Sequence, residues 1–321
     1  MENLVTVARQ VAILFVLMGF GAGMRKAGFF RENAIDGIVN ILILVVTPCL
    51  IVDVFQRPYD PGQLRSLGIA FALAVLVHLA LIALARLVVR HRSEDVRRPL
   101  LLAAVFSNAG FMGVPLEQAV LGDDGVFYGV VYVVVFNLFM WSWGYHIMKN
   151  EERRVMSVDG KTPHSSFFNL HSVVNPGTVG IALGAPLFFL SVKLPAVIAV
   201  PVHHMANLNT PLAMIVIGYA LAGAEFGAVL RTGAVYVAAA VRLVICPLLV
   251  IAALFPFHRS LDRNMMLALV IAASAPVAAM VSMFATKFRR DVDTAVSVVS
   301  GTTLLSILTM PVVIALAMSV L

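Results

Sequence analysis

The sequence predicts an all-α polytopic membrane protein of ten transmembrane helices, arranged as two inverted five-helix repeats. Of its 321 residues, 60% are hydrophobic and only 12% are charged, and the mean hydropathy is +0.95. Soluble domains are instead near half apolar and about a quarter charged. The chain divides into ten apolar stretches, and helix-breaking residues recur at matching places on the two sides of one polar segment.

An α-helix needs about 20 apolar residues to cross the hydrocarbon core of a bilayer. The ten stretches are, in chain order, 5–24, 35–55, 65–89, 99–121, 125–148, 175–192, 196–222, 228–255, 263–286 and 294–319. Their connections are short except for the polar segment 149–172, which predicts a cytoplasmic linker. This linker separates a first five-helix repeat, 1–148, from a second one, 173–321. Asn175-Pro176 supplies an N-cap and a first-turn proline for the sixth helix.

The lysines and arginines predict the orientation of the chain. With the N-terminus outside, the inner loops carry 16 of the 23 lysines and arginines and the outer loops carry five. Cytoplasmic loops of membrane proteins carry such an excess. We therefore expect a multi-pass protein of the cell (inner) membrane with both termini on the non-cytoplasmic side. The net charge of +6 then reflects inner loops beside a lipid bilayer, and no nucleic-acid partner is expected.

Two pairs of helix-breaking sequences stand in corresponding spans of the two halves. Thr47-Pro48 in the second span matches Thr210-Pro211 in the seventh, at an offset of 163 residues. Ser107-Asn108-Ala109-Gly110 in the fourth matches Ala273-Ser274-Ala275-Pro276 in the ninth, at an offset of 166. Because each half has an odd number of spans, homologous halves must lie with opposite topology. Paired breaks in inverted halves point to the binding site of a secondary transporter.

The breaks have a chemistry that suits an anion. Proline removes a backbone donor and glycine permits non-helical dihedrals, so both leave peptide groups unpaired. At membrane depth such groups are tolerated only against protein or a polar cavity. The N–H groups at a half-helix start also carry partial positive charge, which favours a carboxylate. The alternative is a plain proline kink. The substrate-binding candidates at the breaks are Asn108, Ala109, Gly110, Ser274, Ala275 and Pro276.

Three segments resemble the auxin efflux carrier family, whose bacterial members include malonate and malate permeases. They are SNAGFMGVP in the fourth span, VRLVICPLL in the eighth, and the tail from SAPVAAMVSMFATKF through SGTTLLSILTMP. With the loop-poor ten-span layout, the resemblance covers nearly the whole chain. The plant carriers have a much longer central loop, so regulation through that loop is not expected here.

The resemblance implies the fold of bile-acid symporters and sodium/proton antiporters. Spans 1, 2, 6 and 7 would form a scaffold domain, and spans 3–5 and 8–10 a transport domain that moves against it like an elevator. The broken helices 4 and 9 would cross near the midplane, with Pro48, Gly113, Pro115, Pro211 and Arg242 supporting the crossover. A homodimer through the scaffold is also implied. Gly19 and Gly23 on the first helix would allow close helix packing.

Three asparagines inside the spans are candidates for contact with substrate. Asn108 matches the crossover asparagine of the family, and its amide can donate to a carboxylate and accept from a hydroxyl; its alternative role is to cap the break. Asn137 lies where the family places a polar residue of the fifth helix, and an interhelical hydrogen bond is the equal alternative. Asn207 and Asn209 both precede the break of the seventh span. Asn207 either faces the cavity from the scaffold side or packs between helices.

Arg242 stands near the centre of the eighth span. An unpaired guanidinium there would cost at least about 2.5–3.5 kcal/mol, so this side chain must face a partner or a wet cavity. It either attracts the anionic substrate or braces the crossover by donating to the freed carbonyls of the broken helices. Its five fixed donors suit carbonyl oxygens as well as carboxylates, and we favour bracing.

The remaining polar groups predict little further chemistry. Asp53, Glu117 and His78 are the remaining candidates for proton coupling. Asp53 and Glu117 lie towards the outer ends of their spans, within reach of water, so an ordinary hydrated carboxylate is favoured for each, and His78 is expected to be a packing residue. No metal or cofactor site is expected, and neither an HEXXH motif nor a pair of membrane aspartates indicates an enzyme. The sequence therefore favours a secondary carrier of a small mono- or dicarboxylate such as malonate, malate or an auxin-like acid. An anion channel or a membrane sensor of the same fold is the alternative.

Overall fold

The computed structural model describes residues 2–29, 32–149, 176–224 and 226–321. Within this part of the chain every regular element is helical. Among the described residues, seven helices are long and apolar enough to cross a membrane, as expected of a polytopic membrane protein. They are Val7–Lys26, Ala34–Phe55, Pro61–Val88, Asp123–Met148, Ala196–Ala222, Gly233–Phe257 and Val292–Val320. The predicted fourth, sixth and ninth spans correspond to shorter helices, and the predicted linker falls outside the described residues except for Lys149.

The first half of the chain contains the helices up to α8. They are α1 (Glu2–Lys26), α2 (Glu32–Ile41), η1 (Leu42–Val46), α3 (Thr47–Phe55), α4 (Pro61–Val88), α5 (Glu94–Val105), η2 (Ala109–Gly113), α6 (Val114–Leu121), α7 (Asp123–Phe139), η3 (Met140–Gly144) and α8 (Tyr145–Met148). The fourth predicted span is thus divided into α5, η2 and α6.

The second half begins at α10. Its helices are α10 (Pro176–Phe189), α11 (Ala196–Asn207), α12 (Asn209–Ala222), α13 (Phe226–Arg231), α14 (Gly233–Ala239), η5 (Ala240–Ile245), α15 (Cys246–Leu254), η6 (Phe255–Phe257), α16 (Arg263–Ser274), α17 (Met280–Lys287) and α18 (Val292–Val320). The ninth predicted span is divided into α16 and α17.

Prolines explain three of the π-helical segments. The segments η1, η2 and η5 each end two residues before a proline, namely Pro48, Pro115 and Pro247. Because proline lacks an N–H and its ring clashes with the carbonyl four residues earlier, the helix widens into a π-turn instead of ending. Pro48, expected to break its span, therefore lies within a continuous helix from residue 34 to 55. The seventh span is interrupted at Leu208, between α11 and α12, three residues before Pro211.

Aspartates cap the starts of three helices, α4, α16 and α18. The side chains of Asp60, Asp262 and Asp291 accept hydrogen bonds from backbone amides in the first turns of α4, α16 and α18 at 2.8–2.9 Å. A cap of this kind satisfies one of the amides that a helix start leaves without an intrahelical partner. Local sequence therefore sets where these helices begin.

Two glycines bring α1 and α12 into backbone contact. A Cβ atom at Gly21 would lie 2.1 Å from the carbonyl oxygen of Ile215, and one at Gly218 would lie 1.8 Å from that of Met18. No side chain larger than hydrogen fits at either position without moving a helix. The predicted packing glycines, Gly19 and Gly23, lie elsewhere on α1, where a Cβ at either position would meet no atom within 4 Å. Both are exposed.

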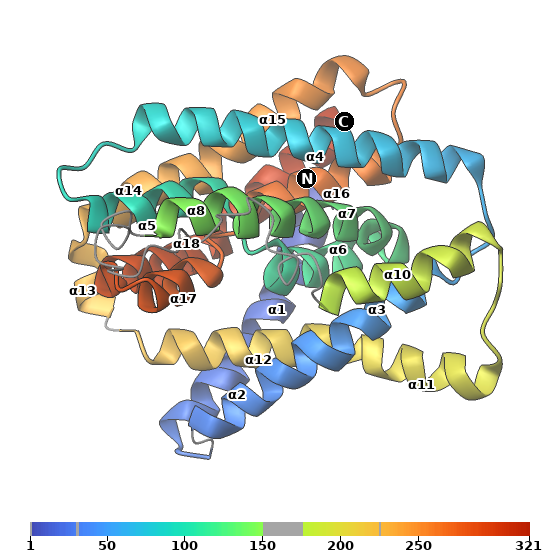
Figure 1. Cartoon of the computed structure of the whole chain (residues 1–321), viewed down its shortest axis with the longest axis horizontal. Coiled ribbons are helices and arrows are strands. Elements are labelled where there is room, and N and C mark those ends of the chain that lie inside the picture. The colour runs from blue at the N-terminus through green and yellow to red at the C-terminus, as the bar shows by residue number, and fades with distance from the viewer. Residues whose placement is uncertain (1, 30–31, 150–175, 225) are drawn as a thin grey trace, which may run out of the picture.

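The helices form two groups in Figure 1. The helices α2, α3, α11 and α12 run through the lower part of the view, and α4, α14 and α15 cross its upper part. In the first group α1 packs on α12, and α3 packs on α10 and α11. In the second, α7 packs on α4, α6 and α16, and α18 packs on α14, α16 and α17. The groups touch where α1 meets α18 and where α3 meets α7.

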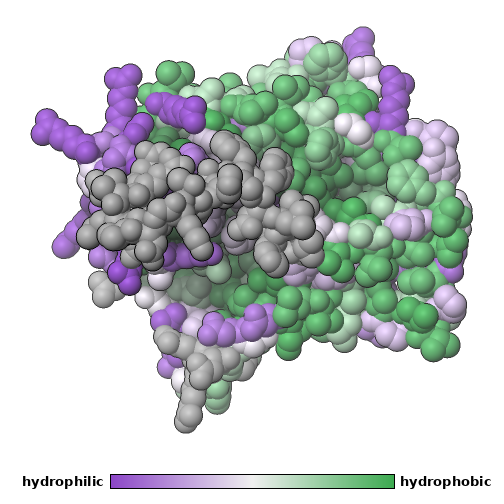
Figure 2. Space-filling view, in the orientation of Figure 1, coloured by the Kyte–Doolittle hydropathy of each residue, from purple (hydrophilic) through white to green (hydrophobic). Residues whose placement is uncertain are grey.

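The surface is largely apolar, as lipid contact requires. Large hydrophobic side chains such as Val16, Phe20, Leu76 and Leu308 are more than half exposed. Figure 2 shows hydrophobic side chains over much of the visible face, while hydrophilic ones gather at the end where α4 turns towards α5. An apolar surface of this extent is typical of a protein surrounded by lipid.

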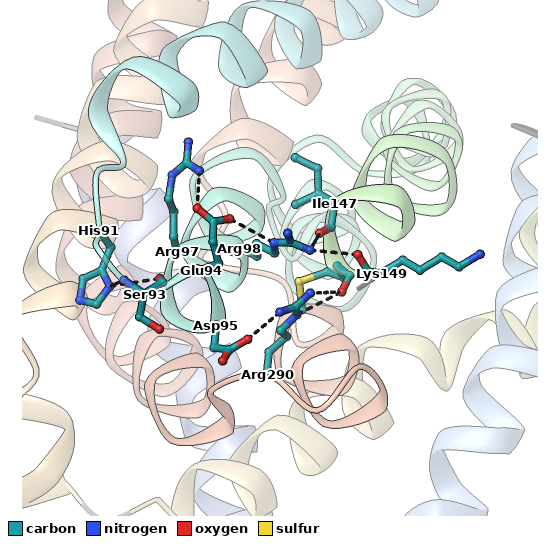
Figure 3. A network of polar contacts seen from close by, with 10 residues as sticks. His91, Ser93, Glu94, Asp95, Arg97, Arg98, Ile147, Lys149 and Arg290 are labelled. Atoms are coloured by element: carbon teal, nitrogen blue, oxygen red, sulfur yellow. Dashed lines mark hydrogen bonds and ion pairs between the residues drawn. The ribbon is translucent and has the colours of Figure 1, made fainter. Parts of the chain in front are cut away.

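Charged side chains tie several helix ends together at that hydrophilic end (Figure 3). Arg290 donates to the carbonyl of Met148 and, at 2.6 Å, to Asp95. Arg98 donates to the carbonyls that precede and follow Met148. Arg97 and Arg98 also donate to Glu94, which holds the pKa of that carboxyl below its usual range. The ends of α5, α8 and α17 are thereby held together.

Candidate functional site

The breaks in the fourth and ninth spans lie against each other. Ser107 and Val277 form an isolated antiparallel β-bridge. The amide of Asn108 donates to the carbonyl of Pro276 at 2.6 Å, and the amide of Ala278 donates to that of Phe106 at 3.0 Å. Each break therefore satisfies peptide groups that the other leaves unpaired. Inside a membrane, backbone N–H and C=O groups that a helix break leaves free must find hydrogen-bond partners elsewhere in the protein.

Arg242 completes this arrangement from η5. Its side chain is 0% exposed and donates to the carbonyls of Val105, at 2.9 Å, Ala273 and Ala275. These carbonyls lie where α5 and α16 end. Each helix C-terminus carries roughly half a negative charge, so two of them balance about one guanidinium. Arg242 thus donates to carbonyls of both broken helices.

Cys246 lies one turn after Arg242 and extends the same support. Its buried thiol lies 3.8 Å from the carbonyl of Ala104, in the last turn of α5. Thr302 of α18 holds the second break from the other side, because its hydroxyl accepts from the amide of Val277 at 3.2 Å. Sequence reasoning missed Thr302, although a Thr-Thr pair inside an apolar span was the available signal.

The start of η2 is the more open part of the site. The carbonyl of Asn108 accepts from the amides of Met112 and Gly113, so the amides of residues 109–111 precede the first intrahelical bond. Gly110 is exposed, and a Cβ there would meet no atom within 4 Å. The side chain of Asn108 is 6% exposed, at the N-cap position of η2. A small anion approaching Gly110 would meet a helix start.

The candidates of the second break are more enclosed. Ser274 is 1% exposed and donates to the carbonyl of Ile271 at 2.8 Å. Ala275 and Pro276 are also buried. On the support side, a Cβ at Gly113 would lie 3.5 Å from the Cα atom of Ala272. A methyl group at Gly113 would therefore be in ordinary van der Waals contact with α16.

The other asparagines differ in their surroundings. Asn137 is half-buried and donates to the carbonyl of Val133 on its own helix at 2.9 Å. Asn207 is exposed at the end of α11, whereas Asn209 is 5% exposed at the start of α12. At this break Asn209 is therefore the residue that the fold buries.

The expectation that the side chain of Glu117 is within reach of water is wrong. Its side chain is 0% exposed, and neither carboxyl oxygen has a hydrogen-bond partner among the described residues. A carboxyl oxygen of Asp53, on α3, lies 2.9 Å from the Nδ1 atom of His203, on α11, at a partly exposed position. His78 is buried, with its Nδ1 atom 2.8 Å from the carbonyl of Ala74 and its ring stacked on Phe139, as a packing residue would be.

These features define a class of protein, a multi-pass membrane protein with two broken helices meeting inside it. A family model described as "Membrane transport protein" matches residues 6–314. The chain belongs to this family, that of the auxin efflux carriers. An "Uncharacterized transporter" of Methanothermobacter thermautotrophicus strain Delta H is 25% identical over 309 residues, which cover 94% of this chain and 95% of that protein.

Proposed function

We propose that this membrane transport protein is a secondary carrier of small organic anions, mono- or dicarboxylates such as malonate, malate or an auxin-like acid. In this proposal the anion binds at the two breaks, with Asn108, Ala109, Gly110, Ser274, Ala275 and Pro276 around it. Asn137 and Asn207 would contribute from the neighbouring helices. The carrier would work by alternating access of the elevator type.

One observation carries the proposal, namely the position of Arg242 against two helix C-termini. Its charge is taken up by the carbonyls of Val105, Ala273 and Ala275. The negative ends of α5 and α16 are thus compensated, while the start of η2 keeps its partial positive charge. A site with this electrostatic balance favours an anion of low charge held by amides.

The two groups of helices support the elevator motion. The group of α1–α3 and α10–α12 would be the scaffold, and the group of α4–α8 and α14–α18 would be the transport domain. The breaks lie within the second group, so its movement would carry the bound anion across. In this proposal the halves 1–148 and 173–321 are inverted repeats and the termini lie on the non-cytoplasmic side of the inner membrane.

A homodimer through the scaffold is part of the same proposal. Gly19 and Gly23 are exposed on α1 beside Val16 and Phe20, which are more than half exposed. Small residues spaced in this way allow a second helix to approach closely within a bilayer.

Counterflow in proteoliposomes tests the proposed function. Vesicles loaded with unlabelled malonate or malate should transiently accumulate the labelled acid against its concentration gradient while the unlabelled acid leaves. Only an alternating-access carrier exchanges substrate in this way. Downhill flux without counterflow would show a channel, and binding of these acids without any flux would show a sensor.

A further inference from the structure

The most unusual side chain outside the breaks is that of Glu117. It lies on α6, nine residues after Asn108, and is completely buried. Neither of its carboxyl oxygens has a hydrogen-bond partner among the described residues. A buried charge without a partner is strongly disfavoured, and ionisable groups inside membrane proteins are rare and usually functional.

Glycines create the space that holds this carboxyl. A Cβ at Gly129 of α7 would lie 1.7 Å from one carboxyl oxygen of Glu117 and 2.6 Å from the other. Gly125 allows the same close approach, because a Cβ there would lie 2.8 Å from the backbone oxygen of Glu117. The described residues therefore leave room for the carboxyl but supply no donor to an ionised form.

None of the described ionisable groups on neighbouring helices pairs with the carboxyl of Glu117. The helix α6 packs against α7, α16, α1, α12 and η2. The titratable or charged side chains described on these elements are Asp123, Asp124, Tyr128, Tyr132, Arg263, Arg9, Arg25, Lys26 and Tyr219. None of them forms a hydrogen bond or ion pair with Glu117. Asp123 instead accepts from Gln118, and Asp124 pairs with Arg57.

A metal cation fits this pocket less well than a proton. Hard cations are held by several oxygen ligands at once. The described residues include no group of three His, Cys, Asp or Glu side chains that could hold a metal ion, and the oxygens of Glu117 lie against Gly129. A proton needs only the carboxyl itself.

We propose that Glu117 is the proton-binding residue of this carrier and that its protonation is coupled to anion binding. This inference rests on the proposed function. The carboxyl is neutral in the present conformation and releases its proton to water when the contact between α6 and α7 opens. Binding an anion at the start of η2 favours the neutral form, because two negative charges would otherwise share one short segment in a low dielectric.

The backbone around α6 allows such an opening. The helix has eight residues, and it lies between the π-helical segment η2 and Gly122, whose φ is +68°. A glycine adopts a positive φ at little steric cost and so can end a helix. Because η2 begins at the substrate break, a shift there is transmitted directly to Glu117. The anion and the proton would then cross together, which makes the carrier a symporter.

The first arm of the test needs no substrate. In the infrared spectrum of the purified protein at neutral pH, a protonated carboxyl absorbs at higher frequency than a carboxylate. We expect this band in the wild-type protein and in Asp293→Asn, which removes an exposed carboxylate, and its loss in Glu117→Gln. Glu117→Met is a second neutral variant in case the glutamine amide, which needs more partners, prevents folding. A wild-type protein without the band, or a band that persists in both variants, would overturn the proposal.

The second arm measures coupling in proteoliposomes with labelled malonate. With the membrane potential clamped, an inward gradient of one pH unit is a tenfold proton ratio and supports up to about tenfold accumulation at one proton per anion. Wild type and Asp293→Asn should show this accumulation. Glu117→Gln should keep malonate counterflow but lose the response to the gradient. Gradient-driven accumulation in this variant would overturn the proposal, whereas absence of malonate counterflow in wild type would count against the proposed function alone.

Discussion

At the scale of single residues, the site depends on how an intramembrane cation is neutralised without a carboxylate. Arg242 has three carbonyl partners contributed by two segments far apart in the sequence. A guanidinium presents donors in a planar fork and can reach several acceptors at once, whereas an ammonium acts as a compact point charge. The identity of residue 242 as arginine, and not only its charge, is what holds the two breaks together.

Arg242→Lys should therefore lower the thermal stability of the protein more than its affinity for substrate. A lysine would keep about one of the three bonds, and each lost bond to a charged group costs roughly 1.5–3 kcal/mol. The midpoint of thermal unfolding in detergent measures the effect. Arg289→Lys, at an exposed position, is the matched control and should leave the midpoint unchanged. Unchanged stability with a large loss of affinity would instead place Arg242 in contact with the anion.

Asn108→Ala should weaken carboxylate binding while the helix break is kept. The substitution removes amide donors at the start of η2, and the loss of one bond to a charged group lowers affinity about ten- to a hundredfold. Ligand-induced thermal shifts and counterflow rates would measure this, with Asn40→Ala on the exposed face of α2 as control. If Asn108→Ala transports every accepted carboxylate like wild type, the substrate site lies elsewhere.

At the scale of helices, glycines and prolines determine different features. Prolines act through the local backbone, which is why π-turns precede Pro48, Pro115 and Pro247. Glycines act through space, because Gly21 and Gly218 bring the backbones of α1 and α12 together. In lipid there is no hydrophobic force between helices, so such close packing is a principal source of their association.

Gly218→Ala should destabilise the pairing of α1 with α12. The new methyl group would lie 1.8 Å from the carbonyl oxygen of Met18, so the helices must separate, and overpacking of this kind costs typically about 1–3 kcal/mol. Gly68→Ala on α4 is the control, because nothing lies within 4 Å of its Cβ position. There alanine should be neutral or slightly stabilising, since it is the better helix former. Equal melting temperatures of the two variants would contradict the close contact.

At the scale of the whole molecule, transport by the proposed mechanism requires the two groups of helices to slide. One contact that joins them is the ion pair of Arg57, after α3, with Asp124 at the start of α7, at 2.7 Å. The Arg57 guanidinium also lies 4.3 Å from the centre of the Phe127 ring. In an elevator motion this contact would break, so it belongs to one of the two end states.

Cysteine labelling should show both termini on the outer side of the membrane. The prediction follows from the distribution of 16 against five basic residues between the two sides. In a background in which Cys49 and Cys246 are replaced by serine, a membrane-impermeant maleimide should label Ser319→Cys in intact cells. Ser165→Cys should react only after permeabilisation. Labelling of Ser165→Cys from outside would reverse the orientation.

Much of the fold was predictable because it depends on local chemistry. Transfer of apolar side chains into lipid requires helices, and Pro and Gly interrupt them wherever they occur. The positions of the breaks at Asn108 and Ser274 followed in this way. The prediction of a helix break at Pro48 was wrong, because the helix widens into the π-turn η1 before this proline and continues to Phe55.

The sequence by itself determined that this is a helical membrane protein with two interrupted spans, since hydropathy and backbone propensity are properties of neighbouring residues. Only the tertiary structure decided which partners satisfy the buried polar groups. It gave Arg242 its three carbonyls, buried Asn209 instead of Asn207, and enclosed Glu117 against Gly129. These outcomes depend on contacts between segments far apart in the chain, and inside a membrane each such contact decides whether a polar group is satisfied or left without a partner.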